Sequence, residues 1–125
     1  MNENIAKALK DARKIVIKIG SNTLAKADGT QNTEFMASFA AQCKALVNQG
    51  KQIVVVSSGA QVAGVSTLKE WARKKDVHFR QALCAIGQVE LMTQWRKAFS
   101  EQGLHIGQLL FTKEDFEDNH RSLNI

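Results

Sequence analysis

The sequence contains few of the residues that hold small secreted or metal-binding domains together. Only two of its 125 residues are cysteines, Cys43 and Cys84, and neither belongs to a C-x-x-C pair or has a histidine at metal-ligand spacing. The pattern therefore predicts neither a disulfide framework nor a zinc site. Proline is absent altogether, although average usage of about 5% would place about six in a chain of this length. That absence indicates no particular function.

Long apolar runs are also missing. No stretch approaches the roughly 20 apolar residues that a membrane-spanning helix needs. Residues 1–11 lack the apolar stretch that drives secretion. We therefore expect a cytoplasmic protein with no membrane partner.

The overall composition is typical of one compact globular domain, since 44% of the residues are hydrophobic and 23% are charged. The formal net charge of +5 would permit contact with nucleic acid, but the lysines and arginines are scattered along the chain. Their densest group, Arg73-Lys74-Lys75, is expected to end a polar helix in solvent. Nucleic acid is therefore not an expected partner.

Strands and helices alternate in the predicted order, which indicates an α/β fold. Two apolar runs rich in β-branched residues, 15–19 and 52–57, are typical of parallel strands that are covered on both faces. The segment between them has apolar residues at helical spacing, and Asn32 or Thr33 can cap its start. This strand, helix, strand order predicts a crossover connection between parallel strands.

The remaining segments predict further helices and one further strand. They are a short helix over residues 4–11, a helix over 60–75 with a break near 64–67, a long helix over 79–102, a strand over 104–111, and a last helix that starts at Thr112 and runs through Asp118. Three strands would leave at least one sheet edge unpaired. We therefore expect the chain to be part of a larger structure.

Lys18 lies within the first apolar strand. A cation buried in a sheet is costly unless an anion or hydrogen-bond acceptors compensate it, so the position suggests a phosphate nearby. The alternative is a lysine on an edge strand whose amine lies in water. The sequence pattern favours the first interpretation, a buried lysine that meets a phosphate, over the second.

Two polar loops follow the two strands. Gly20 and Ser21 follow the first strand, and Ser57-Ser58-Gly59-Ala60 ends the second. Ligands of open parallel sheets bind beyond the carboxyl ends of the strands, so we expect the loops to converge. Glycines let backbone amides approach a ligand, and a helix that begins near Ala60 would direct its positive end at an anion. Simple capping of that helix by the serines is the alternative.

Four stretches, in this order and separation, carry a resemblance to a known family. They are Ile17-Lys18-Ile19-Gly20-Ser21, Val55-Val56-Ser57-Ser58-Gly59-Ala60, Ala85-Ile86-Gly87-Gln88 and His105-Ile106-Gly107-Gln108-Leu109-Leu110. On these residues the chain resembles the N-terminal part of the glutamate 5-kinases, a family within the amino-acid kinases. The first two stretches are shared by several amino-acid kinases, whereas the last two favour the glutamate enzymes.

The resemblance implies a fold and a division of labour between two groups of residues. The implied fold is the parallel-sheet α/β/α sandwich of the amino-acid kinases, with residues 1–125 as the N-terminal part of a kinase domain whose nucleotide-binding C-terminal half is absent. Lys18 would be the catalytic residue. The resemblance implies that Lys18, Gly20 and Ser21 bind ATP and its phosphates, and that Ser58, Gly59 and Ala60 bind glutamate. It implies no metal ligand in this part of the chain.

The implied reaction moves the γ-phosphoryl group of ATP, which comes with Mg, onto the side-chain carboxylate of L-glutamate. The product is L-glutamyl 5-phosphate, the first intermediate of proline biosynthesis. Such a transfer needs positioning and charge neutralisation, and the carboxylate is already ionised, so no general base is required. The resemblance also implies a homo-oligomeric full-length enzyme with proline as a candidate feedback inhibitor. The fragment alone is expected to be inactive.

Two other functions stay open at this point. One is a different amino-acid kinase, acting on acetylglutamate, carbamate or aspartate, because the phosphate loops alone would look similar. The other is a non-catalytic binding or assembly module that keeps the fold and pairs its exposed edges with another chain.

Overall fold

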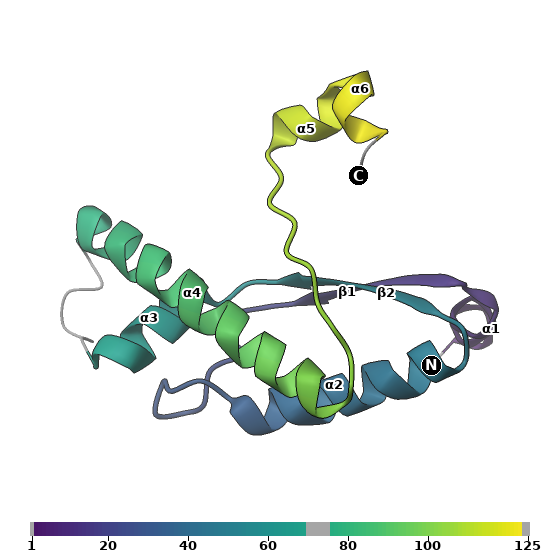
Figure 1. Ribbon diagram of the computed structural model, residues 1–125, viewed down its shortest axis with the longest axis horizontal. Helices are drawn as coiled ribbons and strands as arrows, with labels where there is room; N and C mark the ends of the chain where they lie inside the picture. The colour runs from purple at the N-terminus through teal and green to yellow at the C-terminus, as the bar shows by residue number, and fades with distance from the viewer. Residues whose placement is uncertain (1, 70–75, 124–125) are drawn as a thin grey trace.

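The computed structural model describes residues 2–69 and 76–123. Within this part the elements follow in the order α1 (Glu3–Asp11), β1 (Lys14–Ile19), α2 (Thr33–Asn48), β2 (Gln52–Ser57), α3 (Ala60–Leu68), α4 (Val77–Glu101), α5 (Lys113–Glu117) and α6 (Asn119–Ser122). Helices α2 and α4 lie on the same side of the sheet, and α3 lies beside α4 (Figure 1). The predicted α/β order is confirmed, and both predicted strand positions are correct to within one residue.

Strands β1 and β2 pair in parallel, with Lys18 opposite Val56 and Ile19 opposite Ser57. Alternate side chains point to opposite faces of the sheet. One face packs against the core through four aliphatic residues, Ile17, Ile19, Ile53 and Val55. The other face carries Val16, Val54 and Val56, which are 67%, 48% and 49% exposed. The prediction that the strands are covered on both faces is therefore wrong for the described residues, because the helices cover only one.

The core lies between the covered face of the sheet and helices α2 and α4. Met36 and Cys43 of α2 and Leu91 and Trp95 of α4 are almost completely buried in it. Burial of a leucine or methionine side chain contributes about 1.5–3 kcal/mol. Helix α2 begins as predicted, since the side chain of Asn32 accepts a hydrogen bond of 3.1 Å from the Phe35 amide.

Helices α3 and α4 approach so closely that their backbones touch. A Cβ atom added to Gly64 of α3 would lie 2.1 Å from the carbonyl oxygen of Leu83, and one added to Gly87 of α4 would lie 1.8 Å from the carbonyl oxygen of Ala60. Both glycines therefore permit contact that any other residue would prevent. The predicted helix break near residues 64–67 is wrong, because Gly64 lies within a continuous helix and serves this contact. The end of that predicted helix, 70–75, lies outside the described residues.

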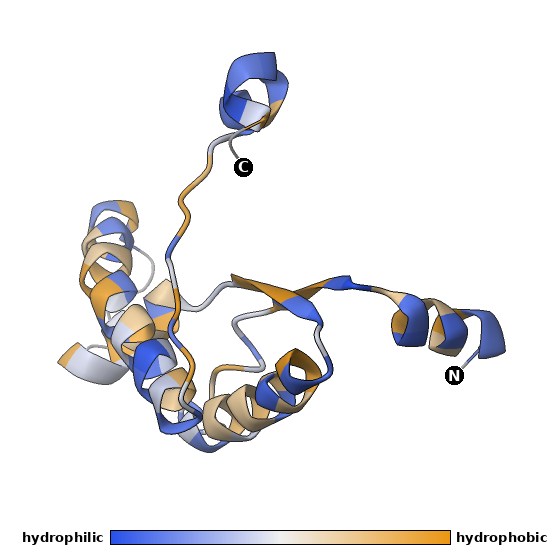
Figure 2. Cartoon of the chain, turned by 45° about the vertical axis from the view of Figure 1, so that its right-hand side comes forward, coloured by the Kyte–Doolittle hydropathy of each residue, from blue (hydrophilic) through white to orange (hydrophobic). Residues whose placement is uncertain are grey.

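The predicted third strand is not formed in the described structure. Residues 104–111 leave the end of α4 as an extended arm, and the sheet contains only β1 and β2 among the described residues (Figure 1). Leu104 and Ile106 still pack against the core, whereas Leu109 and Leu110 are 67% and 78% exposed. Figure 2 shows hydrophobic stretches, in orange, along this arm. The prediction is wrong because an apolar pattern alone does not make a strand, which also needs a neighbour for its backbone hydrogen bonds.

The arm ends in two short helices where one was predicted. Helix α5 begins after Thr112 as expected, and the Asp115 carboxylate accepts hydrogen bonds from the Thr112 amide and hydroxyl at 2.6 and 2.9 Å. The hydrogen bond from the Thr112 amide has the largest effect, and together with the bond from the hydroxyl it lowers the pKa of Asp115 below its ordinary value. The chain then bends at Asp118, whose carboxylate accepts from the amides of His120 and Arg121 and so starts α6.

We expect Gly87→Ala to lower the free energy of unfolding by about 1–3 kcal/mol or more, because the new methyl group would overlap the Ala60 carbonyl and force α3 away from α4. Denaturant unfolding followed by circular dichroism measures this. Gly107→Ala is the matched control, since a Cβ at Gly107 meets nothing within 4 Å. Equal stability of the two variants would contradict the described packing.

Candidate functional site

The loops that follow β1 and β2 lie side by side at the carboxyl ends of the strands. The amide of Ser58 donates a hydrogen bond of 3.0 Å to the carbonyl oxygen of Ile19, which continues the ladder by one bond beyond the paired strands. Gly20 and Ser21 are therefore held next to Ser58 and Gly59. The predicted convergence of the two loops is confirmed.

The loop after β1 is a tight turn that is anchored in the core. The carbonyl oxygens of Gly20 and Ser21 accept hydrogen bonds of 3.1 Å from the amides of Thr23 and Leu24. The Leu24 side chain is completely buried. Burial of the Leu24 side chain, together with the hydrogen bond of 2.9 Å from the Asn32 amide to the Leu24 carbonyl oxygen, anchors this polar turn.

The predicted burial of Lys18 is wrong, because its side chain is exposed. Lys18 points to the uncovered face of the sheet together with Val16 and Val56, so the interpretation of an edge-strand lysine with an exposed amine fits the structure. The amine nevertheless lies at the loops, since a Cβ built on Gly20 would be 3.6 Å from Lys18 Nζ. Among the described residues no carboxylate forms an ion pair with it, so its charge is available to an anion.

Gly59 joins β2 to α3 in a conformation that favours glycine. Its φ and ψ angles are 112° and 5°, and an added Cβ would lie 3.0 Å from Leu24 Cδ1. Gly59 is also the N-cap of α3, and no side chain caps this helix in the described structure. The positive end of α3 is therefore open to an anion. The alternative role of the serines, capping of α3, is wrong.

The two serines before Gly59 have different surroundings. Ser57 is half-buried, and its hydroxyl donates to the carbonyl oxygen of Ser58 at 2.9 Å. The same hydroxyl accepts a hydrogen bond of 2.9 Å from Trp95 Nε1 of α4. Ser58 is exposed. Its hydroxyl makes no hydrogen bond with the described residues and is free to meet a ligand.

Sequence reasoning missed the contact between Ser57 and Trp95. The two residues are 38 positions apart and join only when α4 packs against the sheet. One general signal was present in the sequence. A tryptophan on the inner face of a helix carries an N–H group that needs an acceptor when buried.

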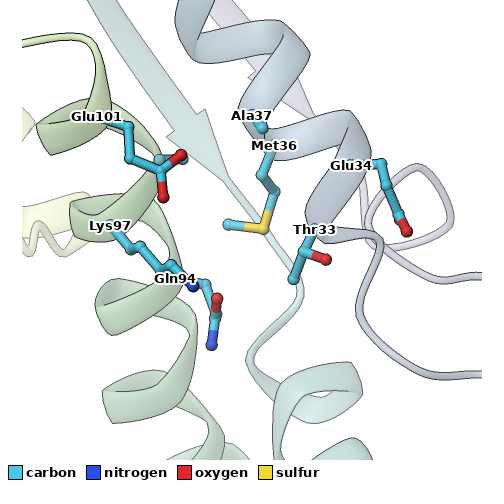
Figure 3. Close-up of a pocket in the computed structure, with 8 residues that line it drawn as sticks. Thr33, Glu34, Met36, Ala37, Gln94, Lys97 and Glu101 are labelled. Carbon is cyan, nitrogen blue, oxygen red and sulfur yellow. The ribbon is translucent and has the colours of Figure 1, made fainter.

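A cavity of about 290 Å³ lies apart from these loops, between α2 and α4. Met36 of α2 points into it toward Gln94 and Lys97 of α4 (Figure 3). At its rim the Glu34 carboxylate pairs with Lys26 at 2.8 Å, and the hydrogen bond from Lys26 lowers the pKa of Glu34. None of the predicted site residues lines this cavity.

Metal-binding clusters and membrane-spanning helices are both absent from the part of the chain that the structure describes. No group of three or more histidine, cysteine, aspartate or glutamate side chains is placed to hold a metal ion there. None of the helices in residues 2–69 and 76–123 combines the length and apolarity that a membrane crossing requires.

Comparison with known proteins identifies the family. The model of the amino acid kinase family matches residues 13–125. The chain belongs to the amino acid kinase family. Its α/β layout with a parallel two-stranded sheet is consistent with a part of the fold of these kinases.

Several curated amino acid kinases are similar to most of this chain. The glutamate 5-kinase of Alkaliphilus oremlandii is 55% identical over 117 residues, which are 94% of this chain and 44% of the relative. The glutamate 5-kinase of Alkaliphilus metalliredigens is 52% identical over 97% of this chain and 46% of the relative. The glutamate 5-kinase of Treponema pallidum (strain Nichols) is 50% identical over 91% of this chain and 44% of the relative. The chain thus spans about half the length of the curated relatives it matches.

We expect Gly59→Ala to destabilise this amino acid kinase chain by about 1–3 kcal/mol, because alanine is strained at a φ of 112° and would press on Leu24. Denaturant unfolding measures the change. Gly20→Ala serves as the control, since Gly20 has no positive φ and its added Cβ would make only ordinary contacts. Unfolding of Gly59→Ala at the same denaturant concentration as Gly20→Ala would contradict the described turn.

Proposed function

We propose that this chain forms part of a glutamate 5-kinase and contributes the phosphate- and glutamate-binding loops at the ends of β1 and β2. The enzyme would transfer the γ-phosphoryl group of ATP to the side-chain carboxylate of L-glutamate, and so begin proline biosynthesis. One observation carries the proposal. Relatives named glutamate 5-kinase are 50–55% identical to this chain over more than nine-tenths of its length.

Lys18 is the proposed catalytic residue. Its amine lies beside Gly20 at the mouth of the sheet and has no anionic partner among the described residues. A phosphoryl group in transfer carries negative charge on its oxygens, and a preorganised cation stabilises that charge. The exposure of Lys18 does not oppose this role, because an unpaired ammonium group is available to a phosphate from solvent.

The phosphate group of ATP suits the loop that follows β1. Lys18 supplies the positive charge, and Gly20 and Ser21 supply main-chain groups in a turn that Leu24 holds in place. ATP would supply the phosphoryl group that is transferred, with Mg as its counterion. The loop residues Gly20, Ser21 and 57–60 include no carboxylate. We therefore propose that this part of the chain acts on the phosphate and does not itself ligate Mg.

Glutamate is the proposed ligand of Ser58, Gly59 and Ala60. The exposed Ser58 hydroxyl can donate to a carboxylate, and the uncapped start of α3 favours negative charge. The ligand would thus lie next to the phosphate loop, because the Ser58 amide and the Ile19 carbonyl join the two loops. Adjacent binding of two anionic groups is what an in-line transfer requires.

The remaining properties of the enzyme are proposals for the complete gene product. They are a cytoplasmic location, assembly into a homo-oligomer and feedback inhibition by proline. We propose that the present chain is inactive alone, because it spans only 44–46% of the first relatives.

We expect Lys18→Ala in the complete gene product to lower turnover at least about tenfold, because it removes a positioned charge from the transferred group. The assay follows the acyl phosphate as a hydroxamate, with glutamate and ATP as substrates. Lys14→Ala is the matched control, since Lys14 is exposed on the same strand and face but lies at the opposite end of β1. Wild-type turnover in Lys18→Ala would refute the assigned role.

We expect Ser58→Ala to raise the KM for glutamate about tenfold, because a hydrogen bond to a charged group contributes about 1.5–3 kcal/mol. The KM for ATP should stay within about twofold, since Ser58 lies on the loop assigned to glutamate. Steady-state kinetics with each substrate varied in turn measure both constants. Ser100→Ala, an exposed serine on α4, is the control. An equal rise in both KM values would assign Ser58 to neither substrate.

A further inference from the structure

We propose that Trp95 is a positioning residue, which sets the orientation of the Ser58–Gly59 peptide through the hydroxyl group of Ser57. This inference rests on the proposed function, in which the Ser58–Gly59 peptide takes part in binding glutamate. It concerns a chain of two hydrogen bonds, from Trp95 Nε1 to Ser57 Oγ at 2.9 Å and from Ser57 Oγ to the Ser58 carbonyl oxygen at 2.9 Å. We call this chain the indole relay.

The indole ring itself is rigidly held. Trp95 is only 3% exposed, and its ring packs against Phe39 and Phe99 with centroid distances of 5.7 and 5.9 Å. These rings come from α2 and α4, so the indole cannot tilt without disturbing the core. A buried indole N–H needs an acceptor, and among the described residues Ser57 provides it.

The hydroxyl of Ser57 transmits this fixed position to the loop. A hydroxyl group has one proton to donate, so acceptance of the indole hydrogen leaves that proton for the Ser58 carbonyl. The amide of Ser58 is meanwhile bonded to the Ile19 carbonyl at 3.0 Å. Both backbone polar groups of Ser58 are therefore held.

The planarity of the peptide bond carries the effect to Gly59. The Ser58 carbonyl and the Gly59 amide belong to one planar trans unit and point in opposite directions. A Ser58 carbonyl held by Ser57 therefore directs the Gly59 N–H to the other side of the loop. Gly59 has a φ of 112° and could otherwise adopt several orientations at little cost. The relay selects one of them before the substrate binds.

The close contact of α4 with α3 explains why the tryptophan reaches the loop. Gly87, two turns before Trp95 on α4, touches the backbone of Ala60. Helix α4 thus contacts the residues on both sides of the Ser58–Gly59 peptide, since its Gly87 touches Ala60 and its Trp95 bonds to Ser57. We expect this fixed peptide to favour glutamate binding, because Ser58, Gly59 and Ala60 are the residues assigned to glutamate.

The test uses the complete gene product and compares Ser57→Ala with Ser57→Thr. Alanine removes the hydroxyl, whereas threonine keeps it and suits the end of a strand. We expect Ser57→Ala to raise the KM for glutamate about fivefold, the effect of losing one neutral hydrogen bond. The KM for ATP should stay within about twofold, and Ser57→Thr should restore the wild-type value for glutamate.

Trp95→Phe tests the other end of the relay, because phenylalanine keeps an aromatic ring and lacks the N–H group. We expect it to raise the KM for glutamate in the same way, and the double variant with Ser57→Ala to be no worse than Ser57→Ala alone. Phe35→Leu is the control for packing, since Phe35 stacks on Phe39 at 5.9 Å without touching Ser57. It should lower stability and leave the kinetics unchanged.

Three results would decide against the relay. They are wild-type kinetics in both Ser57→Ala and Trp95→Phe, equal changes in the KM values for glutamate and ATP, and additive effects in the double variant. Each leaves the proposed function intact, because the wild-type enzyme would still phosphorylate glutamate. A wild-type gene product without activity toward glutamate would instead overturn the proposed function, and the relay's role in glutamate binding with it.

Discussion

The backbone contact between α3 and α4 is the constraint on which the site depends. Gly87 brings α4 against the carbonyl of Ala60, and Gly64 brings α3 against the carbonyl of Leu83. The contact fixes where α3 begins, and so where the chain must turn after β2. Gly59 makes that turn with a positive φ, and because glycine has no side chain, it leaves the first turn of α3 without a side-chain cap. An open helix start beside the end of a parallel strand is a favourable place for an anion.

The two faces of the sheet have different environments, since one packs on the core and the other is exposed. Its inner face packs on the helices through Ile17, Ile19 and their neighbours on β2, whereas its outer face exposes three valines and Lys18. The same strand thus anchors the fold with alternate residues and presents a cation with the residue between them. Lys18 is paired in the sheet and precedes Gly20 by only two residues, so its amine lies beside Gly20.

Most of the fold could be predicted from local pattern. The β-branched runs located β1 and β2, Asn32 located the start of α2, and the order of elements gave the parallel crossover. The predicted helix break near Gly64 was wrong, because a glycine within a helix indicates either a break or a close contact. Only the position of α4 distinguishes these two cases. The segment from Leu104 to Phe111 misled because its apolar pattern does not reveal whether a neighbouring strand is present.

The candidate site was predicted in part. Its errors, like those in the fold, arise from tertiary contacts that a local pattern does not reveal. The two loops follow strand ends, so their convergence followed from topology. Whether Lys18 is buried or exposed depends on what covers the second face of the sheet. The residues of β1 do not specify that. The link from Trp95 to Ser57 depended on the packing of α4 across a separation of 38 residues. The local pattern indicates only that a buried indole N–H needs an acceptor, and it does not indicate which residue provides one.

The most direct measurement is the formation of acyl phosphate by the complete gene product, trapped with hydroxylamine, for a panel of acceptors. We expect hydroxamate that depends on both ATP and L-glutamate, with little from aspartate, acetylglutamate or carbamate. Turnover of one of those acceptors without turnover of glutamate, or no ATP-dependent product at all, would contradict the proposed role of the paired loops.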